Sequence, residues 1–131
     1  MEAVKSFKIG PADNPANYGG PVIYGESHKR ILGLIEAYKK EFRLAYEGEV
    51  PSDGFFVPPT IFADVSPRSR LAQEEIFGPV LALIKAKDMD QALEIANGTQ
   101  YALTGGVFSR SPANIEKVRS SYECGNLYIN R

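Results

Sequence analysis

Apolar side chains recur with helical spacing in the first third of the chain. Between Ser27 and Phe42 they gather on one side of a helical projection, while Lys, Arg and Glu fill most of the other side. This periodicity predicts an amphipathic helix, for which Ser27 is a suitable N-cap. Residues 2–10 have the spacing of a last helical turn or two, and the Pro-, Asn- and Gly-rich residues 11–23 predict a loop.

The middle of the chain alternates between turn signals and short apolar runs. Residues 43–48 predict a short strand. Residues 55–65, "FFVPPTIFADV", are rich in aromatic and β-branched side chains, but Pro58-Pro59 restricts them to an edge strand or a bent strand. Residues 66–72 predict a loop or a short helix, and the nearly continuous apolar run "VLALIKA" at 80–86 predicts a strand covered on both faces.

Strand-like and helix-like segments alternate over residues 80–130. One helix is predicted after an N-cap at Asp88 and before a stop at Gly98, and another after an N-cap at Ser111. The alternation is typical of an α/β fold in which βαβ units build a mostly parallel sheet. The two later strands are predicted at residues 104–109 and 125–130.

Composition narrows the class of protein. The 131 residues, 44% hydrophobic and 24% charged, are enough for one core, and we expect a single domain over residues 1–131. A net charge of -1 gives no electrostatic basis for binding nucleic acid or an anionic membrane. One Cys and one His exclude a disulfide framework and a His-pair metal site. No apolar run reaches the roughly 20 residues that cross a bilayer, and no signal-peptide core is present, so we expect a cytoplasmic protein.

The segment at 73–80, "QEEIFGPV", is the first candidate for chemistry. Adjacent side chains point in different directions on regular structure, so Glu74 and Glu75 make a poor acid–base pair. One interpretation is a solvated turn. The other is a binding site, in which one carboxylate accepts hydrogen bonds from the paired hydroxyls of a sugar and Phe77 lies beside a flat heteroaromatic ring. Gly78-Pro79 would fix the turn in the second case.

The remaining candidates are weaker. Cys124 has no base at a suitable spacing, so we expect a quiet, partly buried thiol rather than a nucleophile. His28 is expected at the surface. The glycine pair at 105–106 lacks the spacing of a phosphate-binding loop and predicts close packing or a turn. Tyr101 and Phe108 are expected in the core. The residues alone therefore indicate no catalytic group and no metal ligand.

A family resemblance enters with the same segment. "EEIFGPV" is followed by "ALEIAN", "YALTGGVFS" and "GNLYIN" with the order and spacing of the NAD(P)-dependent aldehyde dehydrogenase superfamily, and "GPVI" and "GFFVPPTIFADV" precede it in family order. The resemblance covers essentially all 131 residues and implies part of an aldehyde dehydrogenase catalytic domain. "GFFVPPTIFADV" and "GNLYINR" are most similar to the branch that oxidises L-glutamate γ-semialdehyde to L-glutamate in proline degradation.

The resemblance also implies roles for particular residues. Glu75 resembles the glutamate that binds the nicotinamide-ribose hydroxyls, and Phe77 resembles the aromatic residue at the nicotinamide end of the cofactor. The implied cofactor is NAD, with NADP as an alternative. The family's nucleophilic cysteine stands in a Gly-Gln-x-Cys context that this sequence lacks, and its general-base glutamate is also absent. No catalytic residue is assigned, and we expect the isolated chain to be inactive.

The resemblance further implies that the chain is a fragment without the Rossmann cofactor domain and the oligomerisation strand. The full-length form would act on a small-molecule aldehyde and would form a homo-oligomer. Two alternatives stay open: a short non-catalytic paralogue that serves as a binding or regulatory module, and a different aldehyde dehydrogenase branch with another substrate.

Overall fold

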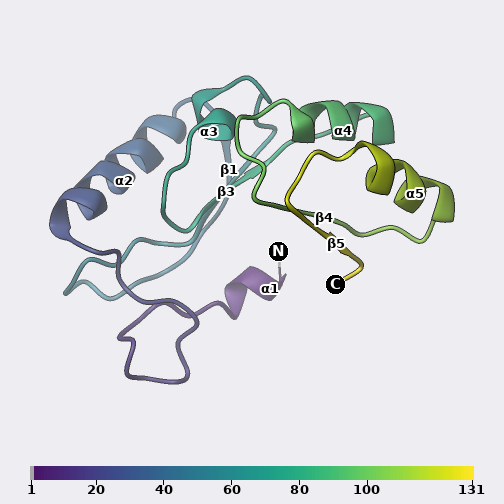
Figure 1. Cartoon of the computed structure of the whole chain (residues 1–131). Helices are drawn as coiled ribbons and strands as arrows, with labels where there is room; N and C mark the ends of the chain where they lie inside the picture. The colour runs from purple at the N-terminus through teal and green to yellow at the C-terminus, as the bar shows by residue number, and fades with distance from the viewer. Residues whose placement is uncertain (1) are drawn as a thin grey trace. The chain divides into compact units, whose positions relative to one another are not determined.

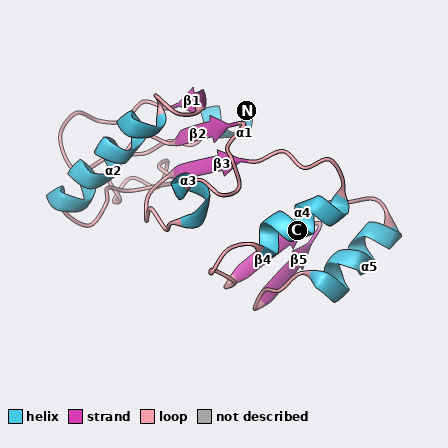
Figure 2. Cartoon of the chain, turned by 90° about the horizontal axis from the view of Figure 1, so that it is seen from above, coloured by secondary structure: helices cyan, strands magenta, loops and turns pink. Residues whose placement is uncertain are grey.

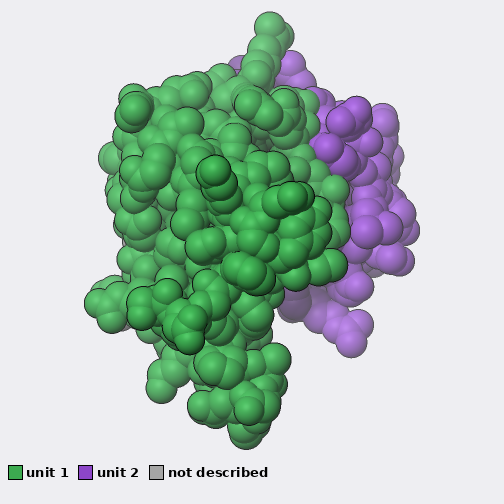
Figure 3. Space-filling model, turned by 90° about the vertical axis from the view of Figure 1, so that its left-hand side faces the viewer, with its two compact units in different colours: residues 1–84 green, residues 85–131 purple. Residues whose placement is uncertain are grey.

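The computed structural model describes residues 2–131, and Figures 1 and 2 show its helices and strands. The chain divides into two compact units, one that ends at Ile84 and one that spans Lys85–Arg131 (Figure 3). The single domain expected over residues 1–131 stays a prediction. Among the described residues, no helix is both long enough and apolar enough to pass through a bilayer.

The first unit is built around a three-stranded sheet with the order β1-β2-β3. β1 pairs with β2 antiparallel, and β2 pairs with β3 parallel, with Thr60 opposite Val80. The helices and strands of this unit are α1 (Glu2–Lys5), α2 (Gly25–Tyr38), β1 (Arg43–Glu47), β2 (Thr60–Ala63), α3 (Arg70–Gln73) and β3 (Val80–Leu83).

The amphipathic helix predicted from Ser27 is α2, but its N-cap is different. The residue at the N-cap is Tyr24, whose side chain makes no capping hydrogen bond. The backbone N–H of His28 donates to the Tyr24 carbonyl oxygen at 3.1 Å, so helical hydrogen bonding starts before Ser27. The prediction of Ser27 as the cap was therefore wrong, because a suitable side chain marks a cap only where the backbone has not already turned.

The buried face of α2 makes the core of the first unit. Ile31 and Ile35 are 0% and 1% exposed, and Phe62 from β2 is 0% exposed. The Tyr38 ring meets the Phe62 ring edge-on, with 6.1 Å between centroids, and burial raises the pKa of Tyr38. Each such fully buried side chain stabilises the fold by about 1.5–3 kcal/mol. The other buried members of the cluster are Val57, Val65, Leu71 and Ile76.

The prolines before β2 do not make it an edge strand. β2 is the central strand of its sheet, and all four of its residues are buried. Pro58-Pro59 lie just before the strand, where their missing N–H groups interrupt no ladder. The Pro59 carbonyl instead accepts from the Gly48 N–H at 2.9 Å, and Thr60 is the first residue to donate across to Pro79 O, at 2.9 Å. Of the two alternatives predicted, an edge strand or a bent strand, the edge strand was wrong for this reason.

β3 is covered on one face only, contrary to the prediction. Val80 and Ala82 pack against the core of the first unit, whereas Leu81 and Leu83 are 51% and 44% exposed. A continuous apolar run does not reveal how many faces are covered, because that depends on neighbours elsewhere in the chain. β3 pairs with β2 in the first unit, and β4 pairs with β5 in the second.

The second unit contains the βαβ arrangement expected from the sequence. β4 (Thr104–Val107) and β5 (Asn126–Ile129) pair in parallel, and α5 (Pro112–Ser121) connects them. α4 (Met89–Asn97) lies with α5 on one face of this sheet (Figure 1). Right-handed crossovers of this length are the rule for parallel strands.

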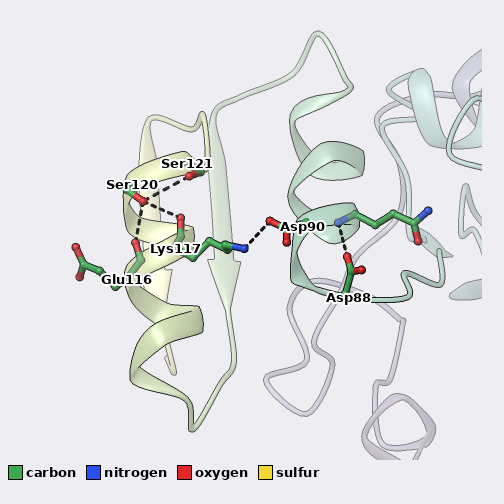
Figure 4. Close-up of polar contacts among 7 residues, drawn as sticks. Asp88, Asp90, Glu116, Lys117, Ser120 and Ser121 are labelled. Carbon is green, nitrogen blue, oxygen red and sulfur yellow. Dashed lines mark hydrogen bonds and ion pairs between the residues drawn. The ribbon is translucent and has the colours of Figure 1, made fainter.

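Side chains at the helix ends hold the second unit together. Asp88 accepts from the Gln91 N–H at 2.9 Å, and Ser111 accepts from the Asn114 N–H at 3.3 Å, so both predicted N-caps are confirmed. Figure 4 shows the Asp88 cap and an ion pair of 2.5 Å between Asp90 and Lys117, which ties α4 to α5. An exposed pair of this kind contributes about 0–1 kcal/mol.

Three further predictions concern the ends and the middle of β4. The close packing expected at the glycine pair is confirmed, because a Cβ on Gly105 would lie 2.5 Å from Tyr122 Cζ. Tyr101 and Phe108 are 46% and 79% exposed, so their prediction as core residues was wrong. Both lie just outside β4, where the chain leaves the packed face of the sheet.

Substitution of the two glycines in β4 separates packing from backbone effects. Gly105→Ala is expected to lower the free energy of unfolding of the second unit by about 1–3 kcal/mol, because the new methyl group overlaps the Tyr122 ring. Gly106→Ala is the matched control, since a Cβ there would meet Tyr128 O at an ordinary 3.5 Å; it should change stability by less than about 1 kcal/mol. Urea unfolding measures both. Equal losses in the two variants would contradict the packing explanation.

Candidate functional site

The candidate site lies on the six residues between the end of α3 and the start of β3. The backbone is already extended at Glu74, with φ -115° and ψ 145°. Side chains then alternate in direction: Ile76 is 9% exposed and belongs to the core cluster, whereas Phe77 is 76% exposed. Glu75 is also exposed. The turn therefore presents Glu75 and Phe77 outward while Ile76 anchors it.

The sharpest backbone feature of the turn is at Phe77. Its φ is 60°, in the left-handed region that a large aromatic residue rarely adopts. The sequence indicated Gly78-Pro79 as the residues that set the turn, but the left-handed residue comes one position earlier. Gly78 packs closely against the core instead, because a Cβ there would lie 3.0 Å from Ile31 Cδ1. Such strained residues cluster at functional sites, where surrounding contacts hold them.

A contact from α2 holds this turn and was missed from the sequence. The Arg30 guanidinium donates through Nη2 to the Ile76 carbonyl oxygen at 2.8 Å. The two residues are 46 positions apart, so no local pattern could have paired them. Hydrogen bonds that involve a charged donor contribute about 1.5–3 kcal/mol, more than neutral ones.

The two adjacent glutamates, Glu74 and Glu75, are both exposed. Glu74 accepts from Arg70 Nε at 2.6 Å, one helical turn away, and this hydrogen bond raises the pKa of the Arg70 guanidinium. The ion pair gives Glu74 a partner within its own helical turn. Glu75 is exposed and lies on the same turn as Phe77. A carboxylate in this position accepts hydrogen bonds, and the neighbouring ring offers a flat apolar face.

The other candidates have structural partners. His28 is half-buried, and its Nε2 lies 3.0 Å from the Phe56 carbonyl oxygen, so the prediction of a surface histidine was wrong. Cys124 is half-buried, as expected, and its Sγ donates to Asn126 O at 3.5 Å. Within the part of the chain that the structure describes, no three His, Cys, Asp or Glu side chains gather in a way that could hold a metal ion.

Comparison with known protein families defines the class. Residues 1–131 match the aldehyde dehydrogenase family, and the chain belongs to this family. Among curated relatives, the 1-pyrroline-5-carboxylate dehydrogenase of Geobacillus sp. (strain WCH70) is 52% identical over 132 residues, and that of Bacillus subtilis (strain 168) is 48% identical over 128 residues. These alignments cover 100% and 97% of this chain but only 26% and 25% of the relatives. The chain thus spans about a quarter of their length.

Solved structures confirm the fold. Proline utilization A from Bdellovibrio bacteriovorus superposes with a TM-score of 0.96 at 59% identity, over 99% of this chain and 14% of that one. A 1-pyrroline-5-carboxylate dehydrogenase from Thermus, solved with bound NAD, gives 0.91 at 44% identity, over 99% of this chain and 25% of that one. The predicted α/β class, as part of an aldehyde dehydrogenase catalytic domain, is confirmed.

Replacement of Phe77 by glycine tests the backbone strain. Phe77→Gly is expected to raise the free energy of unfolding by about 1 kcal/mol, because glycine adopts a φ of 60° without a steric penalty and the exposed ring contributes little burial. Phe108→Gly is the matched control: Phe108 is 79% exposed but its φ is not positive, so this variant should lose stability. Thermal unfolding gives both values. A loss in Phe77→Gly as large as that in Phe108→Gly would contradict the strain.

Proposed function

We propose that the chain forms part of the cofactor site of an NAD-dependent dehydrogenase that oxidises L-glutamate γ-semialdehyde to L-glutamate in proline degradation. The observation that carries the proposal is the turn on which Glu75 and Phe77 are presented outward, with Ile76 anchored beneath. Membership of the aldehyde dehydrogenase family supports the reaction type. The names of the most similar relatives support the substrate.

The residues of the turn fit a nicotinamide cofactor chemically. The Glu75 carboxylate would accept hydrogen bonds from the two hydroxyls of the nicotinamide ribose, as acidic residues do in dinucleotide sites. The exposed Phe77 ring would lie against the flat nicotinamide end. When bound, NAD supplies the hydride acceptor for the oxidation of an aldehyde. NADP carries the same nicotinamide ribose, so this contact does not separate the two cofactors.

This chain's part in the reaction is binding and orientation. A ring and a carboxylate two residues apart would hold the nicotinamide in one orientation toward a small-molecule aldehyde, which lowers the entropy lost on reaching the transition state. We assign no catalytic residue: a thiol attacks only when a base or a positive environment lowers its pKa. The homo-oligomeric state and the cytoplasmic location stay predictions.

A chimeric enzyme tests the proposed function. The corresponding segment of the Geobacillus sp. (strain WCH70) relative is replaced by these 131 residues. The chimera is expected to oxidise L-glutamate γ-semialdehyde with NAD within about tenfold of the parent kcat/KM, or about 1.4 kcal/mol in transition-state free energy. A chimera that folds, as judged by its melting temperature, but neither binds NAD nor turns over substrate would overturn the proposal.

The adjacent glutamates offer a matched pair of substitutions in that chimera. Glu75→Gln keeps the shape of the side chain and removes the charge, so the KM for NAD should rise about tenfold through the weakened hydrogen bonds to the ribose. Glu74→Gln makes the same charge change but affects only the ion pair with Arg70, and it should leave the KM for NAD unchanged. Steady-state kinetics with varied NAD measure both. Equal effects would argue against a ribose contact by Glu75.

The 131 residues on their own are expected to show no dehydrogenase turnover. Cys124 is half-buried, and no residue in the chain is assigned as its base, so covalent catalysis has no activated nucleophile here. NADH formation at 340 nm is the assay, with the chimera as the positive control. Turnover by the chain that disappears in Cys124→Ser would show that this assignment is wrong.

A further inference from the structure

We propose that Arg30 is a positioning residue for the cofactor turn and holds Phe77 in its left-handed conformation from the side of α2. The inference rests on the proposed function, because it names the group that orients the Glu75 and Phe77 side chains. It starts from one contact between distant segments: Arg30 Nη2 donates to the Ile76 carbonyl oxygen at 2.8 Å, and this contact is partly buried.

Two consecutive residues of α2 hold the turn on both sides of Phe77. Arg30 binds the carbonyl of the residue before Phe77. Ile31 packs beneath the residue after it, so closely that a Cβ on Gly78 would lie 3.0 Å from Ile31 Cδ1. A helix residue and its successor point in different directions, so the pair constrains the turn from two sides.

The support for this contact is rigid. Ile31 is 0% exposed and Ile35 is 1% exposed, so the helix that carries Arg30 is fixed in the core of the first unit. Ile76, whose carbonyl accepts the hydrogen bond, is itself buried in the same core cluster. The helix backbone that carries the exposed Arg30 and the segment that supplies the accepting carbonyl are therefore both fixed by the core, and the exposed Phe77 has little burial of its own to hold it.

The chemistry of the contact favours arginine. A residue with φ of 60° and a bulky side chain persists only where its surroundings over-determine the backbone. A guanidinium presents several donors in a fixed plane, and its charge strengthens the bond to the Ile76 oxygen. Loss of this bond removes one of the two constraints on the peptide between Ile76 and Phe77, which would let the Phe77 ring move relative to the Glu75 carboxylate.

Three substitutions on α2 separate positioning from charge. Arg30→Met keeps the aliphatic stem and removes every donor. Arg30→Lys keeps the charge and one donor group, and is expected to rescue part of the effect. Lys29→Met is the matched control, because it removes one exposed positive charge from the adjacent position. The variants are made in the polypeptide as its gene encodes it, and their melting temperatures are compared with the wild type.

The readouts are the Kd for NAD from calorimetry, kcat at saturating NAD, and hydrogen–deuterium exchange of the peptide that contains Phe77 and Gly78. In Arg30→Met we expect the Kd to rise about tenfold and exchange of that peptide to accelerate, with kcat changed by less than about twofold. Arg30→Lys should fall between Arg30→Met and the wild type. Lys29→Met should match the wild type.

Each outcome decides between two statements. Weaker NAD binding in Arg30→Met with unchanged exchange would mean that Arg30 acts on the cofactor and not on the turn, and would overturn the inference. An Arg30→Met variant in which neither the Kd for NAD nor the exchange changes would also overturn it. The same holds if Lys29→Met changes both readouts as much as Arg30→Met does. If Arg30→Met does not fold, Arg30→Lys decides by the same two readouts. A wild type that binds no NAD would overturn the proposed function instead, before any variant is considered.

Discussion

The packing of α2 against the central strand β2 is the constraint on which the first unit depends. Ile31 and Ile35 are removed from water together with Phe62, and this burial supplies the hydrophobic free energy of the unit. The same helix carries Arg30, which donates to the Ile76 carbonyl, and Ile31, which lies against Gly78. A turn that is strained at Phe77 can exist because a helix fixed by its core supports it.

Extended backbone after Glu74 explains how a short segment can present two chemically different groups in one direction. On a regular strand, Glu75 and Phe77 would share a face with each other and oppose Ile76. The left-handed residue at Phe77 bends this strand at its last outward side chain, just before β3 begins. In the proposed function, a dinucleotide would bind at a turn that the core has already ordered, so little conformational entropy would be lost on binding.

The second unit depends on weaker contacts than the first. Its two-stranded sheet is small, and its helices are held by caps and by polar contacts such as Asp90 with Lys117, each of modest strength. Asn97 adds a further tie, because its side chain donates to Ser121 O and accepts from the Glu123 N–H. Phe108 and Leu81 are apolar but exposed, so an apolar residue of this chain is not always buried within it.

Local signals in the sequence predicted the helices, most strand positions, the caps at Asp88 and Ser111, and, through the family resemblance, the candidate residues Glu75 and Phe77. Such features depend on side chains within a few positions of each other, so spacing is enough to identify them. The tertiary structure decided the other features. These are the start of α2, the central place of β2, the uncovered face of β3, the bend at Phe77 and the contact between Arg30 and Ile76. Each depends on which distant segment packs alongside, and no local pattern encodes that choice.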